Sequence, residues 1–209
     1  MKTAVPNKAL KPSEVEPKSA RGEFGSISGY AATFGHEKPD SHGDVIAKGA
    51  FRDSIARIKA ERRVIPLMWN HDSGNLTSYI GTVTSLSEDG YGLFFKADFD
   101  STDEAQRARE LVLDGRLCKF SFSYNVIDQR KVTLANGTRA NELLKLEIHE
   151  ISLVLYPANR DTMVVDVKQG RDELLAEAET ALGKADDAIA SYDQKKRQLL
   201  AQARELLAD

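Results

Sequence analysis

A short serine-bearing segment is the first place in this sequence where residue types and spacing could support chemistry. The segment "LCKFSFSYNV", residues 117–126, alternates apolar and polar side chains, which is the pattern of a half-buried strand. Its polar face carries Ser121 and Ser123, which can be solvated hydroxyls or, beside a base, a nucleophile. Cys118 falls on the apolar face, so we expect it to be a core residue rather than a nucleophile.

A histidine and an acid with complementary chemistry lie in two other strand-like segments. His71 ends the apolar run "IPLMWNH", where the chain leaves the sheet. His149 and Glu150 lie inside "KLEIHEISLVLYP", where a buried charge is costly unless it is paired. A hydrolytic triad of hydroxyl, base and a third group that holds the base supplies one such pairing. The residues alone leave this as one possibility, beside a surface histidine and a solvated serine.

Other kinds of chemical site have little support in the sequence. The four histidines, His36, His42, His71 and His149, form no HxH or HExxH motif, and a single cysteine forms no CxxC motif. Glycine-rich phosphate loops of the Walker or Rossmann type are absent from the sequence. We therefore predict no metal site.

Composition narrows the classes of partner. The 209 residues carry a net charge of −3, which argues against a nucleic-acid-binding protein. An apolar run of ~18 residues, which a membrane span needs, does not occur, and the N-terminus has no apolar core of a secretory signal. One cysteine allows no internal disulfide and fits a reducing compartment.

The pattern along the chain predicts three parts. Residues 1–22 are rich in Lys, Pro, Glu and Ser, which predicts a flexible arm, and residues 23–169 predict one compact domain. In that domain we expect helices over residues 50–63 and 101–115 and strands over residues 24–34, 64–71, 79–87, 91–99, 117–127, 142–156 and 163–167. About seven strands with two helices favour a mainly β fold with some α, a mostly antiparallel barrel flanked by helices.

A seven-residue repeat in residues 170–209 predicts a helical tail. Apolar and small residues recur at two heptad positions, with Lys196 as the charged exception: Leu175, Leu182, Ile189, Lys196 and Ala203, and Ala178, Ala185, Tyr192, Leu199 and Leu206. This pattern predicts a coiled coil or helical hairpin, with residues 172–207 as one helix or as two helices broken near Gly183. The alternative is a long amphipathic helix packed on its own domain.

Four segments together resemble the prohead proteases of tailed bacteriophages, over roughly residues 22 to 168. The segments are "SHGDVIAKGAFRDSI", "IPLMWNHD", "GRLCKFSFSYNV" and "LEIHEISLVLYPAN", in the family's order and with compatible spacing. The resemblance implies that His71 is the general base and Ser121 the nucleophile. It also implies that Glu150 orients His71, whereas analogy with the related herpesvirus assembly proteases would give that role to His149.

The resemblance also implies a fold and a function. The fold is that of the herpesvirus assembly proteases, a seven-stranded, mostly antiparallel barrel wrapped by helices. The function is a serine endopeptidase that cuts scaffold and major capsid protein segments inside the phage procapsid, in the bacterial host cytoplasm, and then digests itself. No cofactor is implied, and a homo-oligomer is expected, either a dimer or a larger assembly held by the C-terminal helix.

Two positions depart from the family's motif, and two other functions stay open. Ser123 and Lys119 stand where the family has glycines, so Ser123 is a second hydroxyl on the face of Ser121, ~6.6 Å along the strand. For the oxyanion donors we select the backbone amides near Asn159 and Arg160, in the loop "YPANRD".

The alternative functions are a catalytically silent protease-like protein that serves capsid assembly, and an esterase-like hydrolase on the same barrel.

Overall fold

The computed structural model describes residues 22–35 and 38–206. The predicted arm, residues 1–22, lies outside the described residues except for Gly22. The chain divides into two units, one that ends at Gln169 and one that begins at Gly170. Within the described residues, the first unit carries all the strands and two α-helices, and the second carries the helix α3.

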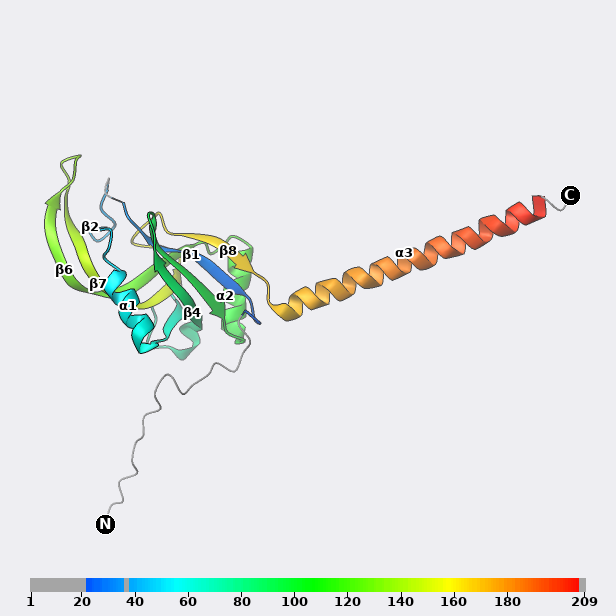
Figure 1. Cartoon of the computed structure of the whole chain (residues 1–209), viewed down its shortest axis with the longest axis horizontal. Helices are drawn as coiled ribbons and strands as arrows, with labels where there is room; N and C mark the ends of the chain where they lie inside the picture. Colours follow the sequence, from blue (N-terminus) through cyan, green and yellow to red (C-terminus); the bar gives the residue numbers. More distant parts are fainter. Residues whose placement is uncertain (1–21, 36–37, 207–209) are drawn as a thin grey trace, which may run out of the picture. The chain divides into compact units, whose positions relative to one another are not determined.

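The first unit is built on one mixed sheet that curls into a half-barrel (Figure 1). Its strands are β1 (Ser26–Thr33), β2 (Asp44–Ile46), β3 (Ile65–Trp69), β4 (Tyr79–Glu88), β5 (Gly92–Phe99), β6 (Lys119–Thr133), β7 (Arg139–Val154) and β8 (Met163–Lys168). They follow the order β2-β7-β3-β4-β5-β1-β8, and β6 pairs with β7. Only β2–β7 and β3–β7 pair in parallel among the described strands, so the predicted mainly β, mostly antiparallel fold is confirmed.

The sheet has one strand more than the sequence predicted. The additional strand is β2, a segment to which the sequence analysis assigned no helix or strand, and its three residues pair in parallel with residues 141–143 of β7. A strand this short carries too few residues to show an alternating pattern, which explains why sequence periodicity missed it. β6 and β7 also extend further toward the "LANGT" turn than predicted, as a long two-stranded ribbon.

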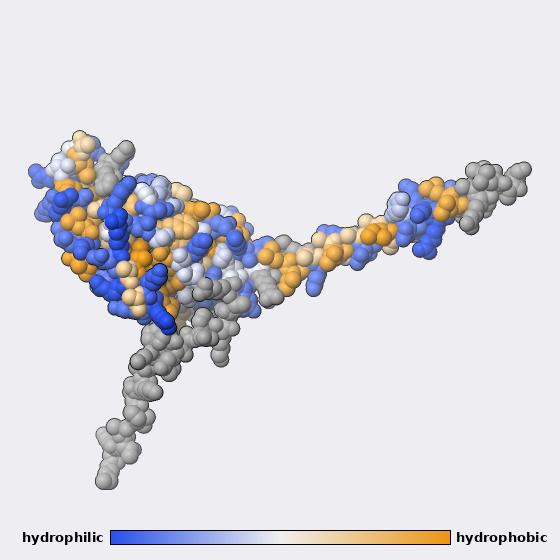
Figure 2. Space-filling model, in the orientation of Figure 1, coloured by the Kyte–Doolittle hydropathy of each residue, from blue (hydrophilic) through white to orange (hydrophobic). Residues whose placement is uncertain are grey.

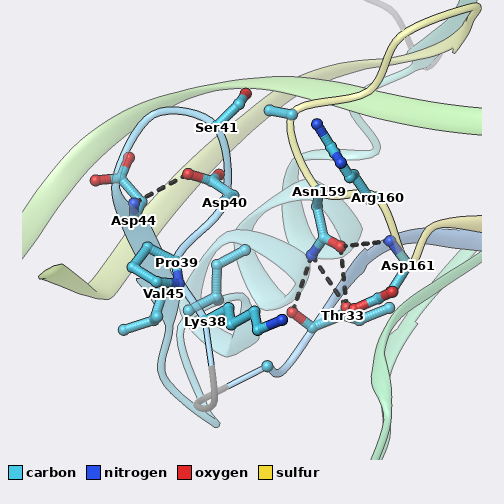
Figure 3. Close-up of a pocket in the computed structure, with 13 residues that line it drawn as sticks. Thr33, Lys38, Pro39, Asp40, Ser41, Asp44, Val45, Asn159, Arg160 and Asp161 are labelled. Atoms are coloured by element: carbon cyan, nitrogen blue, oxygen red, sulfur yellow. Dashed lines mark hydrogen bonds between the residues drawn. The ribbon is translucent and has the colours of Figure 1, made fainter. Parts of the chain in front are cut away.

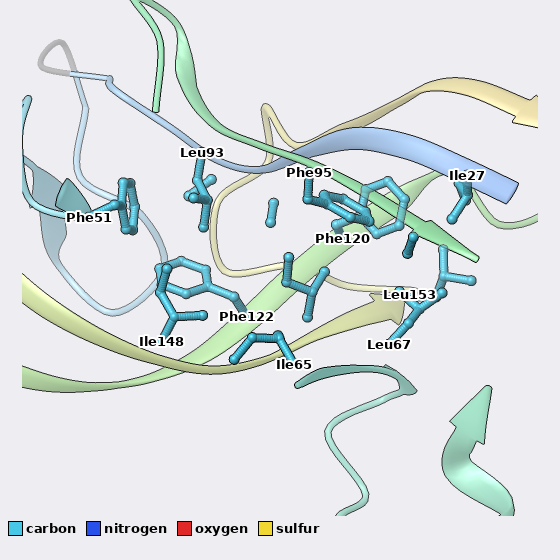
Figure 4. Close-up of a cluster of buried hydrophobic side chains, with 14 of the residues drawn as sticks. Ile27, Phe51, Ile65, Leu67, Leu93, Phe95, Phe120, Phe122, Ile148 and Leu153 are labelled. Carbon is cyan, nitrogen blue, oxygen red and sulfur yellow. The ribbon is translucent and has the colours of Figure 1, made fainter. Parts of the chain in front are cut away.

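Aromatic side chains on the inner face of β6 anchor the hydrophobic core (Figure 4). Phe120 is fully buried and meets Phe95 edge to face, with ring centroids 4.7 Å apart. Phe122 meets Phe51 in the same way at 5.6 Å. Burying a side chain of this size contributes roughly 1.5–3 kcal/mol. Packing in the core therefore fixes the residues on either side of Ser121.

The helix α1 (Arg52–Glu61) docks on β7 through polar contacts as well as through its apolar side chains. The buried hydroxyl of Ser54 accepts a hydrogen bond from the backbone N–H of Ile148, at 2.9 Å. Arg57 and Arg63 both pair with the carboxylate of Glu147, at 3.0 and 2.8 Å. These contacts satisfy the polar groups of β7 directly upstream of Glu150.

The helix α2 (Asp103–Leu113) starts and stops where the sequence predicted. The side chain of Thr102 accepts a hydrogen bond from the backbone N–H of Ala105, which caps the helix. Gly115 follows the helix with φ of 72°, a left-handed conformation that glycine adopts without strain.

The second unit is one continuous helix, α3 (Arg171–Leu206), of 36 residues. It does not break at Gly183, so the single-helix alternative holds within the described residues. Large apolar side chains along it are more than half exposed, including Leu182, Ile189, Tyr192 and Leu199 (Figure 2). Pairing of this helix with another chain stays a prediction.

Two further findings concern the exposure of Cys118 and the hydropathy of the helices. Cys118 is exposed, so the expectation of a core thiol is wrong: β6 begins one residue later, and Cys118 lies in the irregular segment before it. Among the helices of the described residues, none combines the length and hydropathy needed to cross a membrane.

Candidate active site

The register of β6 and β7 gathers polar side chains on one face of the sheet. Ser121 pairs with Ser152, and Ser123 pairs with Glu150, across the antiparallel ladder. Directly opposed residues project to the same side, and residues two apart on a strand share a face. All four side chains therefore share one face, while Phe120 and Phe122 project to the core.

His71 reaches this face because of how β3 ends. β3 runs parallel to β7, with Met68 opposite Ser152 and Trp69 opposite Leu153. Asn70 and His71 then adopt left-handed conformations, with φ of 55° and 59°. Such a conformation costs on the order of 1 kcal/mol for a residue other than glycine, and it reverses the chain direction. The turn brings the imidazole back toward Glu150, two residues upstream of Ser152 on β7.

The imidazole of His71 and the carboxylate of Glu150 are hydrogen-bonded. His71 Nδ1 lies 2.6 Å from Glu150 Oε1. The side chain of Glu150 is only 8% exposed, whereas that of His71 is 37% exposed. An ionised carboxylate only accepts, so the bond assigns the proton to Nδ1 and leaves Nε2 as an acceptor. This is the arrangement that a histidine general base requires.

Ser152 hydrogen-bonds to both His71 and Glu150, and the sequence analysis did not single it out. Its hydroxyl donates to Glu150 Oε2 at 2.6 Å and accepts from the backbone N–H of His71 at 3.1 Å. It has 0% exposure. The available signal was its position two residues after Glu150 inside an apolar run, which places both polar groups on one face.

His149, the alternative third member, lies elsewhere. It falls at a bulge, because Ser123 pairs with Glu150 while Tyr124 pairs with Ile148, and its side chain is exposed. The carboxylate that accepts the hydrogen bond from His71 Nδ1 is that of Glu150.

Both candidate nucleophiles and His71 line one small cavity. Its volume is about 190 Å³, and its walls include Ser121, Ser123, His71, His42 and Tyr124. Neither serine hydroxyl makes a hydrogen bond to His71 among the described residues. Catalytic hydrogen bonds are often long before substrate binds and tighten in the complex, so the shared cavity is compatible with general-base chemistry.

A second cavity of about 400 Å³ adjoins the first, with which it shares Asp40, Ile46, Ala158 and Asn159 (Figure 3). The side-chain amide of Asn159 donates to the backbone carbonyl of Thr33 at 3.2 Å. Its carbonyl oxygen accepts from the backbone N–H of Asp161 at 3.1 Å. Asn159 therefore ties the loop after β7 to the end of β1.

Lys119 also holds this loop. Its ammonium donates to the backbone carbonyls of Arg160 and Thr162, at 2.8 and 2.9 Å. The buried hydroxyl of Thr162 donates to the carbonyl of Phe120, at 2.8 Å. Lys119 is thus bonded to the loop that carries the backbone amides of Asn159 and Arg160, which the sequence analysis selected as oxyanion donors.

Tyr124, a further titratable group of the small cavity, stays protonated at neutral pH. Burial, followed by the nearby charges of Asp44 and Asp40, raises the pKa of the Tyr124 phenol to about 12. A group with that pKa is a poor general base near pH 7. Across the residues that the structure describes, three or more His, Cys, Asp or Glu side chains nowhere gather as a metal site would require.

Comparisons with known proteins agree with the motif resemblance. The sequence is 27% identical over 148 residues to the prohead protease of Enterobacteria phage HK97, which covers 70% of this chain and 62% of that protein. The chain thus spans less than two thirds of that relative's length.

Two solved structures resemble the chain more distantly. One is the KSHV protease in complex with a hexapeptide phosphonate inhibitor, with a TM-score of 0.47, 12% identity, and coverage of 73% of this chain and 68% of that one. The other is the varicella-zoster virus protease, with a TM-score of 0.36, 15% identity, and coverage of 67% and 62%.

The family comparison covers most of the chain. The sequence profile of the caudovirus prohead serine proteases matches residues 10–176, a span that contains all eight described strands and every candidate site residue named above. This chain belongs to the caudovirus prohead serine protease family.

Proposed function

We propose that this chain is a serine endopeptidase with Ser121 as nucleophile, His71 as general base and Glu150 as the group that orients His71. The observation that supports this best is the 2.6 Å bond between His71 Nδ1 and Glu150, beside a cavity that both His71 and Ser121 line. Both hydroxyls line the same cavity, so the cavity does not distinguish Ser121 from Ser123. The choice of Ser121 therefore rests on the motif match.

In the proposed mechanism, His71 Nε2 accepts the hydroxyl proton of Ser121 as Oγ attacks the carbonyl carbon of a peptide bond. Glu150 stabilises the imidazolium that forms. The tetrahedral intermediate collapses, His71 donates its proton to the leaving amine, and an acyl-enzyme remains. His71 then removes a proton from water as the water oxygen attacks the ester carbonyl, and His71 returns that proton to Ser121 Oγ as the carboxylic acid product leaves.

The developing oxyanion needs preorganised donors, and the loop after β7 is our choice for them. Its backbone amides at Asn159 and Arg160 follow directly from the strand that holds Glu150 and Ser152. Lys119 and the Asn159 side chain fix the loop to β6 and to β1. A loop held at both sides provides the rigidity that oxyanion stabilisation requires.

We further propose that the substrates are scaffold and major capsid protein segments inside the procapsid, in the bacterial host cytoplasm, with self-cleavage as a late step. Family membership and the prohead protease of phage HK97 support this assignment. The test is to label the purified chain with a fluorophosphonate and locate the adduct by peptide mass mapping. An adduct on Ser121 supports a serine enzyme. If the chain is folded and carries no adduct, the result argues against a serine enzyme.

The second candidate function is a catalytically silent protease-like protein that serves capsid assembly. The missing hydrogen bond between Ser121 and His71 among the described residues favours this candidate. Coexpression of the chain with its major capsid protein separates the two functions: an enzyme shortens the capsid protein, and a silent protein binds it and leaves its length unchanged.

We propose that residues 23–169 are the protease domain and that α3 joins two or more copies of the chain. A lone helix of 36 residues extends about 54 Å, and its apolar side chains need a partner to leave water. Leu182, Ile189, Tyr192 and Leu199 provide an exposed apolar stripe with the spacing of a coiled-coil seam.

Truncation after Lys168 is expected to leave the domain folded and to reduce the size of the species in solution. The buried hydrophobic residues of the core all precede the cut, so the truncated chain should still show the thermal unfolding transition of the domain. Sedimentation velocity of the full chain and of the truncated chain measures the change. A full chain that sediments as a monomer at every concentration would contradict pairing through α3.

Lys119→Met is expected to lower the rate of fluorophosphonate labelling by about tenfold, because the substitution keeps the aliphatic stem and removes the donors to Arg160 and Thr162. The labelling rate at saturating reagent is the measurement. Lys145→Met, which removes an exposed pair with Asp53, is the matched control and should change little. Equal rates for the two variants would show that Lys119 does not support the loop.

A further inference from the structure

We infer that Ser152 is a positioning residue that holds His71 and Glu150 in their catalytic geometry. The inference rests on the proposed function, since it assigns a role in the same site. Its basis is a closed ring of three hydrogen bonds. Ser152 Oγ accepts from the His71 backbone N–H at 3.1 Å and donates to Glu150 Oε2 at 2.6 Å, and Glu150 Oε1 meets His71 Nδ1 at 2.6 Å.

The ring fixes the carboxylate of Glu150 at both oxygens. One oxygen contacts the imidazole, and the other contacts the hydroxyl of Ser152, so rotation of the carboxylate about its last bond would break a bond at each end. As whole residues, Ser152 is 0% exposed and Glu150 is 6% exposed. Water therefore does not easily replace a hydrogen-bond donor that is lost from the Glu150 carboxylate. The hydroxyl therefore sets the angle at which the carboxylate faces His71.

The ring also holds the backbone of His71. The left-handed conformations of Asn70 and His71 are unfavourable for residues with a Cβ, so the fold must supply contacts that maintain them. Two such contacts come from β7: the N–H of Asn70 donates to the carbonyl of Leu153 at 2.9 Å, and the N–H of His71 donates to Ser152 Oγ. One hydroxyl thus links the backbone of the base to the carboxylate that orients its ring.

A purely structural role for this hydroxyl is the competing explanation, and the chain contains a matched control. Ser54 is also buried, at 1% exposure, and its hydroxyl also accepts a backbone N–H from an adjacent element, that of Ile148 at 2.9 Å. Ser54 makes no hydrogen bond to His71 or Glu150 within the described part of the chain. Ser152→Ala and Ser54→Ala remove the same atoms from similarly buried places, and only the first removes them from the ring.

The test measures labelling of the full chain by a fluorophosphonate. In that reaction Ser121 Oγ forms a bond to phosphorus, fluoride leaves, and the hydroxyl proton passes to His71. For Ser152→Ala we expect the maximal labelling rate to fall by about tenfold or more, with the reagent concentration at half-maximal rate unchanged. For Ser54→Ala we expect a similar loss of thermal stability and an unchanged labelling rate. Ser152→Cys, which keeps the side chain's shape with a weaker donor, should lie between wild type and Ser152→Ala, and it carries the comparison if the alanine variant does not fold.

The outcomes distinguish this inference from the proposed function. Equal labelling rates for wild type, Ser152→Ala and Ser152→Cys would overturn the positioning role while leaving Ser121 as the nucleophile. Equal rate losses for the Ser152 and Ser54 variants would also overturn it, because stability alone would then explain the effect. A folded wild-type chain that is not labelled at Ser121 would instead overturn the proposed function itself.

Discussion

Ser121→Ala is expected to abolish peptide-bond cleavage, with a rate loss of at least about 10⁴-fold, and to leave the fold intact. The substitution removes the only group that forms the acyl-enzyme in the proposed mechanism. The fold should survive because Ser121 contributes a small, half-buried side chain, while Phe120 and Phe122 on either side of it carry the packing. The measurement is mass spectrometry of the wild-type and variant chains after expression with the major capsid protein.

Ser123→Ala is the control for that experiment, because Ser123 projects into the same cavity from the same strand. It should retain measurable cleavage. A reversed result, with Ser121→Ala active and Ser123→Ala inactive, would move the nucleophile one pleat along β6. Cleavage that is unchanged in both variants would contradict serine catalysis at this cavity.

Glu150→Gln is expected to lower the cleavage rate by orders of magnitude, on the order of 10⁴-fold by analogy with the loss of a triad carboxylate. The amide is nearly the same shape as the carboxylate but carries no charge, so it does not stabilise the imidazolium of His71. Its NH₂ group can also face Nδ1, which favours the wrong tautomer of the imidazole. Initial rates near pH 7 with a peptide substrate measure the loss.

His149→Gln is the matched control for the carboxylate, because it changes the neighbouring residue on the same strand to the same side chain. His149 is exposed at a bulge of β7, so this variant should keep most of its activity. A fully active Glu150→Gln enzyme together with an inactive His149→Gln enzyme would transfer the orienting role to His149. Loss of activity in both variants would point to a requirement for the strand's local structure rather than for one side chain.

Much of the architecture could be predicted because it follows from local rules. The alternation of apolar and polar residues predicted the β6 segment, and the Asn-Gly turn in "LANGT" predicted the connection to β7. The cap of α2 at Thr102 and its stop before Gly115 follow from backbone groups within one helical turn. Predictions of this kind succeed because the interacting atoms are close in sequence.

The errors occurred where a long-range contact decides the outcome. β2 has three residues, and it counts as a strand because residues 141–143 provide a partner far along the chain. Cys118 has the right parity for the core face, yet it lies before the point where pairing with β7 begins, so it is exposed. Parity along a strand predicts a face only within the paired region.

The candidate site shows the same division. The sequence by itself determined the types of group available: a hydroxyl on a polar strand face at Ser121, an imidazole at a strand end at His71, and an acid in an apolar run at Glu150. The tertiary structure alone decided that Glu150, and not His149, contacts His71, and that Ser152 joins them. The physical reason is that a bulge at His149 and two left-handed residues after β3 orient these side chains. The bulge is set by the pairing of β6 with β7, and the two left-handed residues end a strand that pairs in parallel with β7 far along the chain. Local periodicity encodes neither long-range pairing.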